Sequence, residues 1–260
     1  PSKLKENNKI LKKLKNNKVK CVQVTNNYTK SFLIKKGVDK KKIFKIPIGI
    51  EIKKFPFISP KKKIILKKKK NLDNYLVIGS FQKDGIGWKN GDKPKKIKGP
   101  DIFVKIINNL KNKHKIHVIL TGPSRGYVIK KLKEMHVSYE HHFLKKYEDI
   151  KKFYKFLDIY LVTSREEGGP RSVLESMASG VVIYSTRVGQ AKEIIKNSHN
   201  GFLYDISKTK EISRKIIKNY LDHKKTKKIL FNARITANSF SYNKMKKDWL
   251  FFFKNLKQKK

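Results

Sequence analysis

The feature that most constrains the fold is the alternation of short apolar runs with longer segments of helical periodicity from residue 75 onward. Parallel strands need a crossover that returns the chain across the sheet, and that crossover is usually a helix. Apolar runs separated by helices therefore predict an α/β fold with a doubly wound parallel sheet. The predicted strands cover residues 75–80, 115–122, 139–144, 157–164, 181–185 and 201–205.

The predicted helices lie between these strands and after them. They cover residues near 100–110, 124–135, 147–156, 170–179, 189–196, 208–222, 224–238 and 241–256. The first part of the chain predicts a helix at 4–17, a strand at 19–24, a helix at 29–37 and a strand at 42–50. Prolines followed by a lysine tract then predict a linker at 58–74. The predicted units are 1–57, this linker, a domain at 75–240, and a helix with a basic tail at 241–260.

The net charge of +45 comes almost entirely from lysine, since only six of the 65 basic residues are arginine. The lysines fall on nearly every predicted helix, and asparagine, isoleucine and phenylalanine are abundant too, which indicates a coding bias toward AT-rich codons. A dedicated nucleic-acid protein would cluster its charge with interleaved aromatics, so no specific nucleic-acid partner is predicted. The charge suits phosphate-bearing ligands and anionic lipid alike.

Cysteine and histidine usage argues against metal and disulfide chemistry. The lone Cys21 allows no disulfide or zinc framework within the chain, which fits a reducing, cytoplasmic compartment. Adjacent His141 and His142 on a strand point to opposite faces and have no third ligand near in sequence. No apolar stretch approaches the roughly 18 residues that span a bilayer. The sequence predicts no metal and no cofactor, with peripheral contact to an anionic membrane left open.

The stretch SREEGGPRSVLESMASG (164–180) joins a predicted strand to a predicted helix. Gly168 and Gly169 allow a sharp turn, and Pro170 suits the first position of a helix. The free backbone N–H groups of Arg171 and Ser172 then combine with the helix dipole to favour an anion. The Arg171 guanidinium adds a fork that matches phosphate. This junction is a predicted phosphate site.

Two glutamates flank this predicted phosphate site. Glu167 precedes the helix, where a carboxylate would be poorly placed unless the phosphate carries a sugar whose hydroxyls need an acceptor. Glu175 lies eight residues later and could accept hydrogen bonds from a ribose diol. The alternative is that Glu167 caps the helix and Glu175 lies on a solvated face.

The segment EGGPRSVLESMASGVVIYSTRVGQAKEII resembles the donor-site motif of retaining glycosyltransferases with the two-domain GT-B fold (glycosyltransferase group 1, family 4-like). The family pattern has two glutamates eight residues apart, a short helix, a strand that starts at a glycine (here Gly180), and a turn like GQAKEII. Val181 and Val182 replace the family's more common Pro-Val. The resemblance implies a Rossmann-like domain at 75–240 that binds a nucleotide sugar, with Glu167 catalytic and Glu175 on the ribose.

Further segments extend the resemblance over residues 75–256. KIKGPDIF resembles the family's K-G-x-D motif, which implies that Lys98 holds the donor diphosphate. The arginine usual after the first strand is Ser80 here, with Lys83 as a substitute. Arg125, after the next strand, is expected at the surface and within reach of the phosphates. The segment after 139–144 resembles the part that holds the nucleobase through backbone near Leu144 and Lys145.

Residues 19–57 resemble the end of the family's N-terminal, acceptor-binding domain. KIPIGIEIKKF is similar to the crossover I-P-x-G-I-D-x-x-x-F, with Glu51 in place of the aspartate. The resemblance implies an enzyme that transfers a hexose-like sugar from a nucleoside diphosphate to a glycan or lipid-linked acceptor, as in polysaccharide biosynthesis. The chain as given is expected to supply the donor-binding half and so to be an incomplete enzyme. The alternative is a non-catalytic protein that binds polyanions or membrane surfaces on the same fold.

Overall fold

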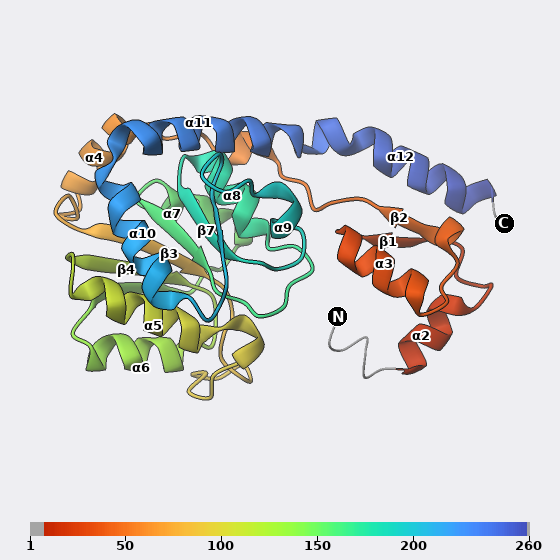
Figure 1. Cartoon of the computed structure of the whole chain (residues 1–260), viewed down its shortest axis with the longest axis horizontal. Coiled ribbons are helices and arrows are strands. Elements are labelled where there is room, and N and C mark those ends of the chain that lie inside the picture. The colour runs from red at the N-terminus through yellow and green to blue at the C-terminus, as the bar shows by residue number, and fades with distance from the viewer. Residues whose placement is uncertain (1–7, 259–260) are drawn as a thin grey trace.

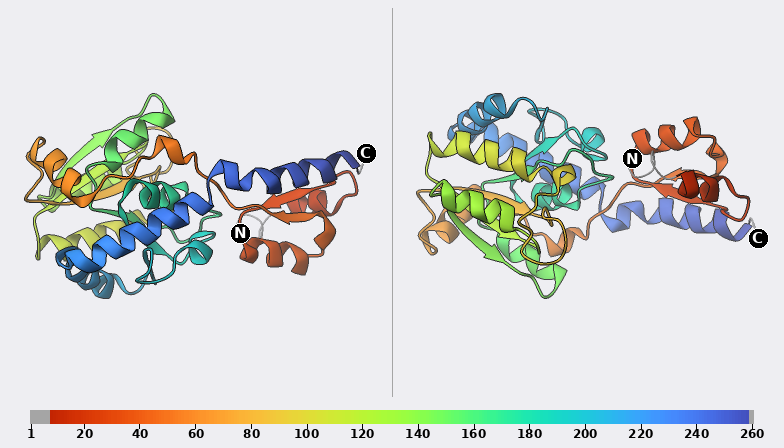
Figure 2. Two further views of the ribbon diagram at one scale, coloured as in Figure 1. Left: turned by 90° about the horizontal axis from the view of Figure 1, so that it is seen from above. Right: turned by 90° about the horizontal axis from the view of Figure 1, so that it is seen from below.

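The computed structural model describes residues 8–258. It has a large α/β part, and a small subdomain beside it that is built from the first elements of the chain (Figure 1). The last helix, α12 (Tyr242–Gln258), leaves the large part and runs along the small subdomain (Figure 2). No helix within 8–258 is long and apolar enough to cross a bilayer.

The large part is built on six parallel strands in the order β5-β4-β3-β6-β7-β8. The order runs outward in both directions from β3 and β6, so the sheet is doubly wound. The predicted α/β fold class is therefore confirmed. The strands are β3 (Leu76–Phe81), β4 (Ile116–Thr121), β5 (Ser138–His142), β6 (Ile159–Val162), β7 (Val182–Thr186) and β8 (Phe202–Tyr204).

Helices cover both faces of the sheet and bury an apolar cluster on each. The central strands are buried along their whole length, which explains why their sequences are continuous apolar runs rather than alternating ones. The edge strand β5 is mostly polar and partly exposed. The helices are α5 (Pro100–Lys111), α6 (Gly126–Glu134), α7 (Lys151–Tyr154), α8 (Arg171–Ser179), α9 (Ala191–Ile194), α10 (Thr209–Leu221) and α11 (His223–Ser239). Short 3-10 turns are η3 (Lys96–Lys98) and η4 (Tyr147–Ile150).

The small subdomain pairs two short parallel strands, β1 (Val22–Val24) and β2 (Ile43–Lys45). The helices α2 (Asn8–Lys15) and α3 (Asn27–Lys35) pack on them, and the turns η1 (Lys40–Lys42) and η2 (Ile52–Lys54) follow. Its apolar cluster includes Leu11, Leu33 and Ile43. Helix α12 closes over β2 with aromatic contacts, since the rings of Phe44 and Phe252 meet edge to face at 5.4 Å.

The segment predicted as a linker contains a helix, α4 (Pro60–Lys68), which packs against the large part. Ser59 caps it by accepting a hydrogen bond from the backbone N–H of Lys62. Lys63 and Lys67 lie one turn apart and are 6% and 4% exposed. Inside the protein the Lys67 ammonium pairs with the Asp158 carboxylate, and the Lys63 ammonium donates a hydrogen bond to the Gly180 carbonyl oxygen. A lysine tract in the sequence does not reveal either contact.

Candidate functional site

The candidate site lies where the carboxyl ends of β3 and β6 meet. The strand order reverses direction at this pair, and loops that leave in opposite directions open a crevice there. Lys98 ends η3, which leads into α5 from the β3 side, while Glu167 lies in the loop after β6. Residues that are far apart in the sequence therefore reach the same edge.

Lys98 and Glu167 form an ion pair at this edge, in which the Lys98 Nζ donates to the Glu167 Oε1. The Ser164 hydroxyl donates to the same oxygen at 3.0 Å. Gly99 makes this approach possible, since it has a φ of +65° and a Cβ there would lie 1.9 Å from the carbonyl oxygen of Thr163. Both side chains stay partly exposed, at 26% and 17%, so a ligand can reach them.

The glycine turn before α8 is held by the small subdomain. The Gly168 carbonyl accepts hydrogen bonds from Thr25 Oγ1 and Asn26 Nδ2, each at 2.8 Å. Pro170 occupies the position before the first helical residue, one place earlier than predicted. No side chain caps α8, so its first N–H groups remain available and Glu167 is not a cap. The geometry of an anion site is therefore present.

A hollow of about 260 Å³ opens beside Glu167. Its lining holds three cations, Arg165, Arg187 and Lys192, beside Glu166 and Glu167. The Asp101 carboxylate already engages Arg165 through two hydrogen bonds of 2.9 and 2.6 Å. Arg187 is paired more loosely with Asp205, at 3.2 Å. Part of this lining was not predicted from the sequence. Arg187 directly follows β7, so it could have been found as Lys98 and Arg125 were, as a cation located after a strand end. The lining residues outside the predicted site set are Tyr28, Arg165, Glu166, Arg187, Val188, Gly189 and Lys192.

Glu175 is buried and held by two tyrosines rather than lying on a solvated helix face, so that alternative is wrong. Its carboxylate accepts hydrogen bonds from Tyr147 Oη and, at 2.8 Å, from Tyr154 Oη. Burial raises the pKa of Glu175, while the two hydroxyls act in the opposite direction. The Arg171 guanidinium lies 5.0 Å from the Tyr147 ring centroid and also donates to Tyr242 Oη at 3.1 Å. Tyr147 therefore joins the two predicted donor-site residues.

The expectation that Arg125 lies at the surface is wrong. Its side chain is fully buried, and it donates to the carbonyl oxygens of Ser80 at 2.6 Å and Thr121 at 2.8 Å. Its Nε lies 2.9 Å from the buried Asp84 carboxylate. These partners leave the guanidinium turned into the protein, where it ties β3 to β4.

The remaining predicted residues lie in the segments that follow β3 and β5. The Lys83 ammonium lies 3.5 Å from the ring centroid of Trp88, which is itself 81% exposed. Leu144 packs against the core after β5, and Lys145 next to it is exposed. Ser80, which stands where the family has arginine, accepts from Arg125 through its hydroxyl at 3.1 Å.

Comparison with known proteins identifies the family. The family described as "Glycosyl transferases group 1" matches residues 93–236, more than half of the chain. A Campylobacter jejuni relative, "GalNAc-alpha-(1->4)-GalNAc-alpha-(1->3)-diNAcBac-PP-undecaprenol alpha-1,4-N-acetyl-D-galactosaminyltransferase", is 27% identical over 158 residues, which cover 59% of this chain and 44% of the relative. The Bacillus anthracis "N-acetyl-alpha-D-glucosaminyl L-malate synthase" is 27% identical over 115 residues, 44% of this chain and 30% of the relative. The chain thus spans less than half the length of these curated relatives.

Solved structures share the fold at low sequence identity. Anabaena HepE in complex with UDP and glucose matches with a TM-score of 0.76 and 19% identity over 90% of this chain and 63% of that one. A sucrose-phosphate synthase from Thermosynechococcus elongatus matches with a TM-score of 0.78 and 16% identity over 96% of this chain and 61% of that one. The chain therefore belongs to the glycosyl transferases group 1 family, an enzyme family, and has the α/β architecture of GT-B glycosyltransferases.

Proposed function

We propose that this chain binds a nucleoside-diphosphate sugar at the carboxyl edge of the sheet and serves in its transfer, with retention, to a glycan or lipid-linked acceptor. One observation carries the proposal: the Lys98–Glu167 pair lies beside the uncapped first turn of α8. A cation, a carboxylate and free backbone N–H groups meet there. The cation and the N–H groups suit a phosphate, and the carboxylate can accept hydrogen bonds from the hydroxyls of a sugar attached to it.

The diphosphate would lie between Lys98 and the first turn of α8. The backbone N–H groups of Arg171 and Ser172 and the positive end of the helix dipole favour negative charge at that point. These groups would stabilise the charge that develops on the leaving diphosphate, and such electrostatic stabilisation usually contributes most to catalysis. No metal is needed in this scheme, because these groups neutralise the phosphates themselves.

Glu167 would accept hydrogen bonds from the sugar hydroxyls. In the structure its Oε1 is held by Lys98 and Ser164. When phosphate engages Lys98, that ammonium turns from the carboxylate to the ligand, and the carboxylate becomes available to the sugar. The pair would thus exchange one internal ion pair for two ligand contacts, which orient the sugar carbon relative to the leaving group.

The ribose would approach Glu175. Tyr147 covers that carboxylate through its hydroxyl, so the tyrosine must give way for a ribose diol to bind there. Tyr154 remains beneath as the internal support of the carboxylate. The nucleobase would then lie near the backbone of Leu144 and Lys145, which follow β5.

The relatives favour a uridine nucleotide as donor. The solved HepE complex contains UDP and glucose, and the name of the Campylobacter enzyme specifies an undecaprenol-linked acceptor. We infer from them a UDP-hexose donor and a lipid-linked or glycan acceptor.

We also propose a cytoplasmic enzyme in contact with an anionic membrane, because α12 exposes Leu250, Phe251 and Phe253 among lysines.

Calorimetric titration with a matched panel of UDP-, GDP- and ADP-sugars tests the donor proposal. The proposal predicts a preference for one base that persists at moderate salt. The alternative, a general polyanion binder, predicts equal binding of all nucleotides and its loss as salt rises.

A further inference from the structure

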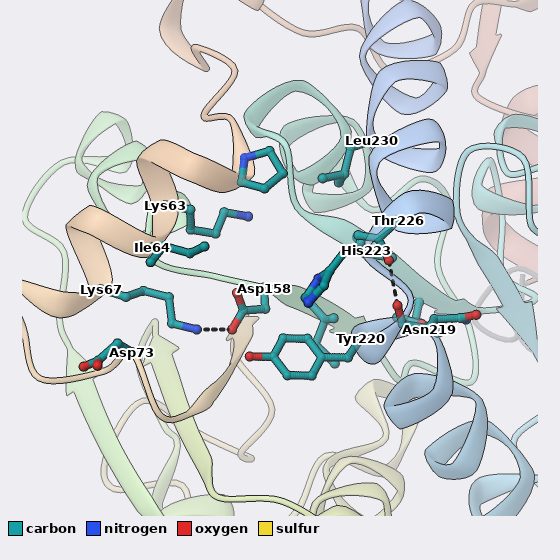
Figure 3. A pocket seen from close by; sticks show the side chains of 14 residues that line it. Lys63, Ile64, Lys67, Asp73, Asp158, Asn219, Tyr220, His223, Thr226 and Leu230 are labelled. Atoms are coloured by element: carbon teal, nitrogen blue, oxygen red, sulfur yellow. Dashed lines mark hydrogen bonds and ion pairs between the residues drawn. The ribbon is translucent and has the colours of Figure 1, made fainter.

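A second cavity, of about 300 Å³, lies at the opposite edge of the sheet, where β6 and β7 begin (Figure 3). Helix α4 forms one wall, and the end of α10 and the start of α11 form the other. Its volume is at the lower end of the range for small-molecule sites. Most of its lining is apolar, including Ile64, Ile159, Val182 and Leu230.

Lys63 is the unusual group in this cavity. It is 6% exposed, and its Nζ donates to the carbonyl oxygen of Gly180 at 2.6 Å. Figure 3 shows its ammonium directed into the cavity. In the part of the chain that the structure describes, no carboxylate lies within ion-pair distance of Lys63. Its neighbour Lys67 differs, because Asp158 lies 2.6 Å from the Lys67 Nζ.

Among residues 8–258, the close partner of this buried ammonium is a carbonyl oxygen, which leaves it without a full counter-charge and costs free energy. A ligand with an anionic end could supply that charge. The ligand must also present an apolar body to the isoleucine, valine and leucine walls. Because Asp73 and Asp158 also line the cavity, a singly charged group fits better than a phosphate dianion.

We propose that this cavity is a binding site for a small apolar monocarboxylate, with its carboxylate on Lys63 and its apolar body between α4 and the first residues of β6 and β7. The site is separate from the donor edge, and the proposal does not depend on the proposed function.

The protonation of Lys63 gives the site a pH dependence. Burial lowers the pKa of Lys63 to about 8, with Asp158 raising it and Lys67 lowering it. A bound carboxylate favours the ammonium, so binding is strongest below pH 8 and weakens above it as Lys63 loses its proton. The other titratable groups that line the cavity are Lys67, Asp73, Asp158, Tyr184, Tyr220 and His223.

The test is ligand-observed NMR with benzoate and its neutral isostere benzamide, on the full chain at pH 7. Lys63→Met should weaken benzoate binding at least about tenfold, the loss expected for a hydrogen bond to a charged group. Ile64→Trp keeps Lys63 but fills the cavity mouth, so it should also abolish binding and covers the case in which Lys63→Met fails to fold. Lys61→Met removes an exposed charge from the same helix and should leave benzoate binding unchanged.

Preferential binding of benzoate that is lost in both cavity variants and kept in Lys61→Met supports the proposal. Equal binding of benzamide overturns it, and so does no binding of benzoate at millimolar concentration. An equal loss in Lys61→Met would show only a general charge effect and would also overturn it.

Discussion

Lys98 and Glu167, which are 69 residues apart, form an ion pair directly before the uncapped start of α8. The pair holds a cation and a carboxylate side by side at the point where a helix dipole favours an anion. Both side chains are partly exposed, so the pair does not act only as a buried ion pair that stabilises the core. Its position argues for a ligand that replaces one ion pair with contacts to both partners.

Removing Glu167 should affect the affinity for a UDP-sugar differently from the affinity for UDP. In Glu167→Ala, the affinity for a UDP-sugar should fall, because the sugar hydroxyls lose the carboxylate that accepts their hydrogen bonds. The affinity for UDP should stay the same or rise, because Lys98 is released for phosphate. The expected loss for the sugar is about 1–3 kcal/mol. Calorimetry with both ligands measures the difference, with the exposed Glu134→Ala on α6 as the control. An equal loss of affinity for UDP and for the UDP-sugar would show that Glu167 does not bind the sugar.

Arg125 should be a stability residue. Arg125→Ala leaves the Asp84 carboxylate buried without its partner, which should lower the free energy of unfolding by about 3–5 kcal/mol. Urea denaturation measures this, and a double variant that also carries Asp84→Ala should lose much less than the sum of the two single losses. An unfolding curve like that of the wild type, together with a large loss of UDP affinity, would show that Arg125 binds the phosphate.

Tyr147 should compete with the ligand for Glu175. Tyr147→Phe removes the hydroxyl that occupies Glu175 and keeps the ring against Arg171, so nucleotide binding should tighten by about tenfold or more, the value of one hydrogen bond to a charged group. Tyr154→Phe is the matched variant, and it should weaken binding because it removes the internal support of the carboxylate. Weaker binding in Tyr147→Phe, measured by calorimetry with UDP, would mean that the hydroxyl contacts the ligand.

Lys63 should make stability depend on pH in the alkaline range. Its folded pKa of about 8 is below the ordinary value of 10.5, so the unfolded chain holds more protons between these values. Stability from this group therefore rises with pH from about 8 to 10.5, by up to about 1.4 kcal/mol per pH unit. The free energy of unfolding of the wild type minus that of Lys63→Met, measured by urea denaturation across this range, should increase. A flat difference would contradict the burial of a charged Lys63.

The sheet and the glycine turn that leads into α8 could be predicted because the information is local, whereas the donor site at that turn stays a prediction. Apolar runs and helical periodicity define the strands and helices, and the glycine turn and the eight-residue spacing of the glutamates lie in one segment. Arg125 could not be placed, because its partner Asp84 comes from another loop and strand-end reasoning treats every such cation as exposed. Tyr147 was missed for the same reason, since it reaches Glu175 only when η4 folds over α8. The sequence predicts the lysines of α4 as part of a linker, because sequence does not show that two of them face inward.

The measurement that tests the account most directly is the affinity of UDP, compared with uridine, for the wild type and for Lys98→Met. Lys105→Met is the control, because it removes an exposed lysine from α5 with no predicted role. The account predicts that Lys98→Met lowers UDP affinity by about tenfold or more while uridine affinity stays the same and Lys105→Met has little effect. An equal loss of UDP affinity in both variants, or an unchanged affinity in Lys98→Met, would contradict a phosphate site at the Lys98–Glu167 pair.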